Sequence, residues 1–125
     1  MAGHSIRSMT GKDLEVFGIK NQRTCRGWVA EGEGKPLAIC FVENNPDSYV
    51  ARSLIKENSN LSKIAIWRLS KQFMEKFRSL GYKHIYAVAD NNIKGSAQFL
   101  ERLGWLPLEQ VEQGRVMLWE RSQYL

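Results

Sequence analysis

A long apolar stripe in residues 61–80 constrains the fold of this chain more than any other feature of its sequence. Within that segment the apolar side chains recur at steps of three and four residues: Ile66, Leu69, Phe73, Phe77 and Leu80. This spacing places them on one side of a helix of about five turns. Gly81 follows, in the position just beyond a helix end where glycine is favoured. The sequence therefore predicts one long amphipathic helix over residues 61–80.

Strands are predicted on the N-terminal side of this helix. Residues 24–44 hold two runs rich in Val, Ile, Trp and Phe around "EGEGKP", whose glycines supply the positive φ that a tight hairpin requires. Residues 48–55, "SYVARSLI", alternate and predict a third strand of the same antiparallel meander. Near the start, a short strand around Ile6 leads into a short helix, because Thr10 and Asp13 have the spacing of a helix cap.

The C-terminal third predicts three more strands and one helix. "YKHIYAVAD" reads as a buried strand, "GSAQFLERL" as a helix that ends at Gly104, and "WLPLEQ" and "RVMLWER" as two final strands. The strand before the long helix and the strand after it are joined by a crossover, so we expect them to be parallel neighbours. This order of elements predicts an α/β (α+β) fold with a mixed sheet and helices on both faces.

Length and composition bound the class of protein. At 125 residues we expect a single domain over residues 1–125. The first eight residues do not resemble a signal peptide and no apolar run is long enough to cross a bilayer, so we expect a cytoplasmic protein without a membrane partner. A reducing compartment would leave Cys25 and Cys40 as thiols. Neither has the spacing of a metal ligand, so we expect no metal site.

The net charge of +5 has two interpretations. It would favour an acidic partner such as a nucleotide cofactor, nucleic acid or an anionic protein surface. It is also what an ordinary soluble surface gives, because the basic residues are spread along the chain with no run of like charge. Nucleic-acid binding ranks last, since the sequence contains no aromatic and basic motif of a known module.

Four segments, in this order and spacing, resemble the GNAT (Gcn5-related N-acetyltransferase) superfamily along nearly the whole chain. They are "IRSMTGKDLE" at 6–15, "WVAEGEGKPLAICFVEN" at 28–44, the long helix followed by "HIYAVAD", and "NNIKGSAQFLERLGW" at 91–105. The resemblance implies a GNAT-like mixed, splayed sheet of about six to seven strands. It also implies that acetyl-coenzyme A lies in a wedge between the fourth and fifth strands, while an amine approaches from the opposite side.

Physical chemistry supports such a site. Where parallel strands part, their backbone N–H and C=O groups lose partners, and the amides of a pantetheine arm can replace them. The N-terminus of the helix beside that point directs free N–H groups at the pyrophosphate. In the last segment Asn91 or Asn92 can hydrogen-bond the pantetheine or cap the helix, and Ser96 is small enough for the cofactor to lie against the helix. Asn92 and Ser96 are therefore candidate cofactor-binding residues.

The loop before the long helix departs from the family. The family's pyrophosphate loop reads R/Q-x-x-G-x-G/A, whereas "IKENSNLSKIAIWRL" at 55–69 contains no glycine. Donors and charge remain available from several residues: Lys56, Asn58, Ser59, Asn60, Ser62 and Lys63. Of these, Ser59, Ser62 and Lys63 are the candidates for cofactor binding. The alternative is that the serines are N-cap residues and the lysine belongs to an ordinary surface, in which case the cofactor site is lost.

The catalytic residues are less well defined than the cofactor site. Many family members carry a Tyr general acid in the late helix, where this chain has Leu100, which cannot donate a proton. Candidates for the general base are Glu43, at the end of a strand near the splay, and Glu57, just after the fourth strand. Trp67, beside Arg68, would either stack on a base or belong to the core.

Two functions are compatible with the resemblance. One is an acetyl-coenzyme A-dependent N-acetyltransferase that acts on an amine in a small molecule or a protein. The alternative is a catalytically inactive GNAT-like binding or assembly module that has lost the cofactor and binds a protein partner or forms a homodimer. The segment "IWRLSKQFMEKFRSL" is similar to small acetyltransferase-like proteins of tailed bacteriophages. A phage virion protein or a host-interaction protein would be an example of such a module.

Overall fold

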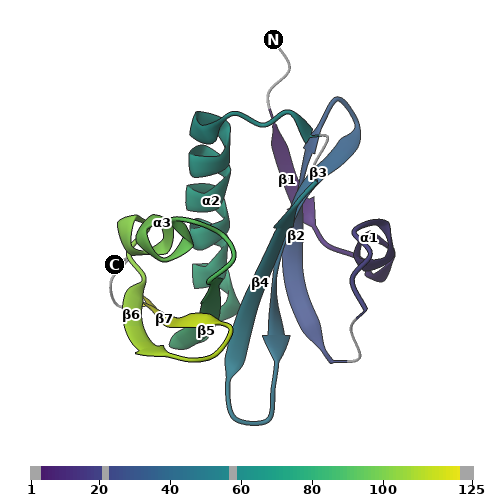
Figure 1. Cartoon of the computed structure of the whole chain (residues 1–125). Coiled ribbons are helices and arrows are strands. Elements are labelled where there is room, and N and C mark those ends of the chain that lie inside the picture. The colour runs from purple at the N-terminus through teal and green to yellow at the C-terminus, as the bar shows by residue number, and fades with distance from the viewer. Residues whose placement is uncertain (1–3, 21–22, 57–58, 122–125) are drawn as a thin grey trace.

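A seven-stranded mixed sheet, with helices on both faces, forms the centre of the protein (Figure 1). The computed structural model describes residues 4–20, 23–56 and 59–121. Within them the strands are β1 (Ser5–Ser8), β2 (Cys25–Gly32), β3 (Lys35–Asn44), β4 (Tyr49–Ile55), β5 (His84–Asp90), β6 (Leu106–Gln110) and β7 (Gly114–Glu120). The helices are α1 (Gly11–Val16), α2 (Lys63–Phe77), the 3₁₀ turn η2 (Arg78–Leu80) and α3 (Ser96–Arg102). The predicted order of elements is confirmed.

The long helix begins slightly later than the apolar stripe indicated. Ser62 is its N-cap, and the Ser62 Oγ accepts a hydrogen bond from the Ala65 N–H at 3.1 Å. The helix ends in the η2 turn, and Gly81 then adopts a φ of 80°, as the sequence predicted. None of the described helices is long and apolar enough to cross a membrane.

Two apolar clusters cover the two faces of the sheet. On one face α1 packs against β2 and β3 through Phe17, Val29, Ile39 and Phe41. On the other face α2 and α3 pack against strands from the whole sheet, in a cluster that includes Cys40. Burial raises the pKa of the Cys40 thiol to about 12, which keeps it protonated and unreactive at neutral pH. Cys25 packs against the α1 cluster, so both cysteines are free thiols on opposite faces.

The sheet consists of two half-sheets that meet at a single strand pair. β1, β2, β3 and β4 form one antiparallel half, and β5, β7 and β6 form the other. β4 and β5 are parallel neighbours, which confirms the prediction from the crossover, but they pair only at Val50 and Tyr86. Strand hydrogen bonding therefore contributes little to joining the two halves.

Aromatic packing around Phe77 joins the two half-sheets instead. The fully buried Phe77 ring, at the end of α2, lies 6.1 Å from Trp28 of β2. It also meets two tryptophans of the other half edge to face, Trp105 at 6.3 Å and Trp119 at 5.7 Å. Edge-to-face pairs of this kind add to the stabilisation that burial alone gives. One side chain of α2 therefore touches both halves.

A buried ion pair fixes α1 to β1. Asp13 is 5 % exposed and accepts hydrogen bonds from Arg7 Nη1 at 2.8 Å, Arg7 Nη2 at 2.7 Å and the Thr10 N–H at 2.7 Å. The Arg7 guanidinium also lies 3.1 Å from Glu31 Oε1 on β2. Arg7 above all holds the pKa of Asp13 well below its usual range.

We expect Phe77→Leu to lower the free energy of unfolding by roughly 1–3 kcal/mol, because it removes three aromatic contacts and leaves a cavity. Phe99→Leu, at a half-buried position, is the matched control and should cost less. Urea denaturation of both variants measures the difference. An equal or smaller loss for Phe77→Leu would contradict the role assigned to Phe77.

We expect Asp13→Asn to destabilise the protein by about 1–2 kcal/mol at neutral pH, a figure kept low because Arg7 is partly solvated. The folded-state pKa of Asp13 is depressed, so the pair stabilises the fold above the unfolded-state value of about 4 and loses that contribution as pH falls below it. In urea denaturation at a series of pH values, the gap between wild type and variant should narrow below pH of about 4. A gap that stays constant would contradict this account.

Candidate functional site

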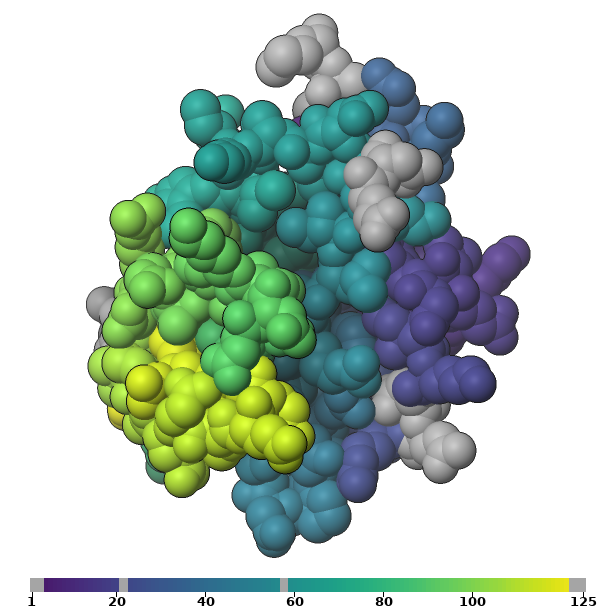
Figure 2. All heavy atoms as spheres, in the orientation of Figure 1, coloured from purple at the N-terminus to yellow at the C-terminus, as the bar shows by residue number. Residues whose placement is uncertain are grey.

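The edges of β4 and β5 diverge beyond the pair of Val50 and Tyr86 and leave a gap in the sheet. Figure 2 shows a groove at this place, between the blue strands β3 and β4 and the green and yellow C-terminal elements. Exposed apolar side chains gather around it. In the described part of the chain eight large apolar side chains are exposed, and five of them lie on elements that border the gap: Leu54, Ile55, Ile64, Val88 and Ile93. Such a concentration is typical of a binding groove.

Backbone groups on both strands point into this gap. The Lys56 N–H donates to the Leu37 carbonyl at 2.9 Å, and bonding to a neighbouring antiparallel strand alternates along the chain. Leu54 therefore directs its backbone groups at β3, whereas Ser53 and Ile55 direct theirs at the gap. By the same alternation, counted from the Asn91 N–H that donates to Gln113, Val88 of β5 faces the gap. The gap thus has two strand edges, between which an extended chain with amide groups fits.

The N-terminus of α2 follows β4 at the open end of the gap. Lys63 and Ile64 are its first two residues, so their N–H groups have no partner within the helix. The Ser59 Oγ accepts from the Leu61 N–H at 3.4 Å, so both Ser59 and Ser62 shape the loop with their hydroxyl oxygens. A serine hydroxyl that accepts in this way can still donate its hydrogen to a ligand.

Asn60 supplies a conformation that the glycine-free loop otherwise lacks. Its φ is 58°, in the left-handed region, which asparagine tolerates better than most residues other than glycine. Sequence reasoning had included Asn60 only as a donor, although asparagine is the usual substitute for glycine in such a turn. Lys56 faces elsewhere, because its Nζ lies 5.5 Å over the Phe17 ring on the α1 side. Glu57 and Asn58 lie outside the described residues.

The turn between β5 and α3 holds the other predicted cofactor residues. The Ser96 Oγ donates to the Asp90 carbonyl at 3.0 Å, and the Asn92 N–H donates to Asp90 Oδ1 at 2.8 Å. The Asn92 side chain is exposed. Asn91, in contrast, is bonded to the β6–β7 region, through Glu112 and Gln110. Of the two asparagines, Asn92 is therefore the one available to a ligand.

Both groups of predicted residues lie at the same end of the gap. Each follows the C-terminal end of one of two parallel strands, and those ends share one edge of a sheet. In addition, Trp67 of α2 meets Phe99 of α3 edge to face at 5.6 Å, so the two helices touch. Ser62 and Lys63 lie about one turn before Trp67, and Ser96 about one turn before Phe99. Trp67 packs on the core, which confirms that interpretation of it.

A row of side chains crosses the closed end of the gap on the face away from α2. Glu43 pairs with Val50 across β3 and β4, and Val50 pairs with Tyr86 across β4 and β5. Paired positions share a face, and adjacent strands lie about 4.8 Å apart, so Glu43 and Tyr86 are separated by about 10 Å. Glu43 is 9 % exposed, and its Oε1 lies 3.2 Å from Arg52 Nη1. Tyr86 was not predicted, because its place in this row depends on strand register.

Leu100, the residue at the family's tyrosine position, packs partly buried against the core. It offers no proton to a ligand. In the described ranges, no group of three or more His, Cys, Asp or Glu side chains is placed to hold a metal ion. The groups at the closed end of the gap are thus a carboxylate, a phenol and a guanidinium.

Solved acetyltransferases share this fold. Spermidine N-acetyltransferase from Vibrio cholerae, in a dodecameric structure, superposes with a TM-score of 0.76 at 14% identity, over 98% of this chain and 96% of that one. An aminoglycoside acetyltransferase in complex with coenzyme A gives a TM-score of 0.70 at 15% identity, over 98% and 97%. An N-acetyltransferase from Staphylococcus aureus Mu50 gives 0.71 at 13% identity, over 97% and 99%. Neither a protein-family model nor a curated protein sequence matches this chain.

These likenesses concern the fold, because each identity is low. The chain has the GNAT fold that the sequence resemblance implied, with the mixed sheet parted between β4 and β5.

Proposed function

We propose that the protein is an acetyl-coenzyme A-dependent N-acetyltransferase that acts on an amine. The observation that supports this proposal is the gap, where two strand edges face each other beside the N-terminus of α2. The backbone groups of Ser53, Ile55 and Val88 would pair with the amides of a pantetheine arm as an added strand. One of the solved structures with this fold holds coenzyme A.

The loop before α2 fits a pyrophosphate even though it lacks glycine. Lys63 would supply a positive charge, and the Lys63 and Ile64 N–H groups would supply donors at the positive end of the helix dipole. The left-handed Asn60 gives the backbone a turn that glycine would otherwise provide. The hydroxyl hydrogens of Ser59 and Ser62 would complete the donors. At the other wall Asn92 would contact the ligand, and Ser96 would hold the turn that carries Asn92.

Acetyl transfer sets the requirements for the closed end of the gap. Bound acetyl-coenzyme A supplies an acetyl thioester. The transfer forms a C–N bond and breaks the C–S bond, so the amine loses a proton and the departing sulfur gains one. Two carboxylates are buried in the described part of the chain, Asp13 and Glu43. Arg7 and Thr10 already hold Asp13, which leaves Glu43 as the buried base.

Tyr86 would serve as the proton donor that Leu100 cannot be. It lies in the same row as Glu43, across Val50, where the gap closes. A base and an acid on either side of the reacting atoms match the two proton movements. Glu57 stays a prediction for the base, since it lies outside the described residues.

The alternative function is a catalytically inactive module with the same fold. Such a protein would keep the Phe77 cluster and the gap but would not bind the cofactor. A phage virion or host-interaction role, and a cytoplasmic location, stay predictions from the sequence. Measurement of coenzyme A binding separates the two functions directly, because millimolar cofactor should stabilise only a protein with a working site.

We expect Lys63→Glu to weaken coenzyme A binding by about tenfold, because it reverses a charge beside the pyrophosphate. Isothermal titration calorimetry measures the affinity. Lys71→Glu makes the same change about 12 Å further along α2 and should leave the affinity unchanged. Since the first turn of α2 holds no acidic residue, Lys63→Glu should not destabilise the helix. Equal affinities in both variants would place the pyrophosphate elsewhere, and an absence of binding in wild type would favour the inactive module.

We expect Glu43→Gln and Tyr86→Phe each to lower kcat by about a hundredfold, with the affinity for acetyl-coenzyme A unchanged. Release of the coenzyme A thiol reports the rate. The exposed Glu101 provides the matched control, Glu101→Gln, which should keep full activity. Activity that survives both changes at Glu43 and Tyr86 would remove the row from the mechanism.

A further inference from the structure

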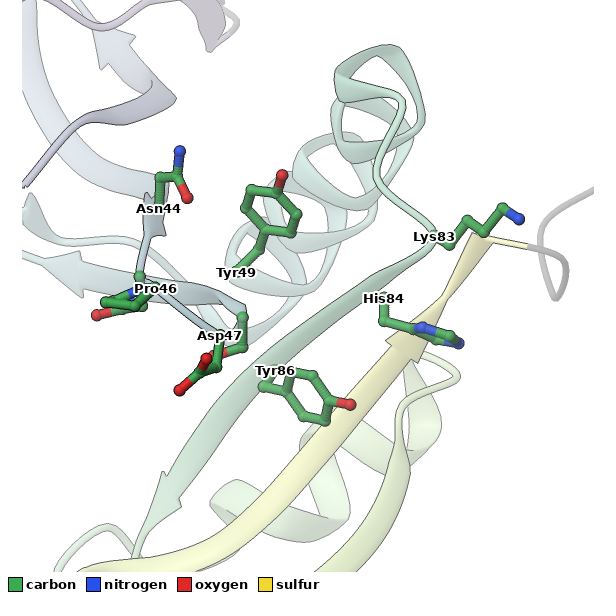
Figure 3. Close-up of a pocket in the computed structure, with 9 residues that line it drawn as sticks. Asn44, Pro46, Asp47, Tyr49, Lys83, His84 and Tyr86 are labelled. Atoms are coloured by element: carbon green, nitrogen blue, oxygen red, sulfur yellow. The ribbon is translucent and has the colours of Figure 1, made fainter.

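A pocket lies at the closed end of the gap, at the end of the sheet away from the predicted pyrophosphate site. Its volume is about 400 Å³. One wall is the β3–β4 turn, residues 44–49, and the other is formed by Lys83, His84 and Tyr86 at the start of β5 (Figure 3). Tyr86 belongs both to this pocket and to the row where β4 meets β5. A molecule in the pocket therefore lies next to the closed end of the gap.

The aromatic part of the pocket is fixed by stacking. The Tyr49 ring stacks on Tyr82 with 3.7 Å between ring centroids and 7° between the ring planes. The turn that precedes Tyr49 is closed by the Asn45 N–H, which donates to the Ser48 carbonyl at 2.9 Å. Aromatic rings such as those of Tyr49 and Tyr86 attract an ammonium group through their faces.

The pocket carries opposite charges on its two walls. Asp47 lies in the β3–β4 turn, and Figure 3 shows Lys83 and His84 on the β5 side. Within the described residues neither Asp47 nor Lys83 forms an ion pair, whereas His84 Nε2 lies 4.0 Å from Glu120 Oε2. One carboxylate thus faces one ammonium and one imidazole, so the lining has no excess of negative charge.

This balance discriminates between classes of amine. A polycation is attracted by several carboxylates at once, and a lone carboxylate opposed by a lysine provides little such attraction. An acceptor that carries both an ammonium and a carboxylate has the complementary pattern, with its ammonium toward Asp47 and its carboxylate toward Lys83. The volume is of the size that small-molecule sites have.

We infer that this pocket binds the acceptor and that the acceptor is a free amino acid, with its amine beside Asp47 and its carboxylate beside Lys83. The inference rests on the proposed function and narrows it. Transfer moves the acetyl group from sulfur to the α-nitrogen, the nitrogen loses its proton to Glu43, and the sulfur receives one from Tyr86. It also separates this protein from the solved neighbours whose names mention spermidine and an aminoglycoside.

Binding by NMR tests the inference without any need for catalysis. The standard amino acids and spermidine are titrated in turn into the ¹⁵N-labelled chain, and the best amino acid is compared with the amine that lacks its carboxylate. We expect an amino acid to shift the amide resonances of residues 44–49 and 83–86, and to bind about tenfold more tightly than its decarboxylated partner. Spermidine that shifts these resonances while no amino acid does would overturn the inference.

Variants assign the two charges. Lys83→Gln should reduce the preference for the amino acid over its decarboxylated amine, and Asp47→Asn should weaken both. Lys71→Gln, on an exposed position of α2, is the control and should change neither. A preference that survives Lys83→Gln would also overturn the inference.

The result is independent of the test of the proposed function. If coenzyme A binds and amines are acetylated but amino acids leave the pocket resonances unchanged, the acceptor class is wrong and the enzyme stands. If an amino acid binds in the pocket while coenzyme A does not bind the chain, the proposed function fails and the pocket stands as an amino-acid site only.

Discussion

The packing of Phe77 against tryptophans from both half-sheets is the contact on which the rest of the structure depends. β4 and β5 pair at Val50 and Tyr86 alone, so the ladder of backbone hydrogen bonds that usually joins neighbouring strands is almost absent there. Burial of apolar surface under α2 replaces it, through Trp28 on one side and Trp105 and Trp119 on the other. The core therefore permits the sheet to part without separating into two units.

The gap follows directly from this arrangement. Strand edges that are not paired carry backbone donors and acceptors, and a buried edge of this kind is costly unless something binds it. Here the edges of β4 and β5 face each other across a groove rimmed by Leu54, Ile55 and Val88. The crossover through α2 then brings a helix N-terminus to the open end. Cofactor binding, the catalytic row and the acceptor pocket are thus assigned to successive parts of one opening.

Much of the fold could be predicted from the sequence, because its signals are local. The apolar period of α2, the stop at Gly81 and the parallel relation of β4 and β5 depend on spacing and on one general rule about crossovers. Ser62, Lys63 and Ser96 could be placed at one end of the sheet for the same reason. The φ of Asn60 could not, since one asparagine in a polar loop has many conformations open to it. The row of Glu43, Val50 and Tyr86 and the pocket beside it depend on register between distant segments, which spacing along the chain does not define.

Amide hydrogen exchange with and without acetyl-coenzyme A tests the central claim, that the parted edges of β4 and β5 bind the cofactor. Ser53 and Ile55 face the gap, whereas Arg52 and Leu54 face β3, so adjacent residues of one strand serve as probe and control. We predict that the cofactor slows exchange at Ser53, Ile55 and Val88 by about tenfold more than at Arg52 and Leu54. Equal changes along β4, or no change, would contradict the account.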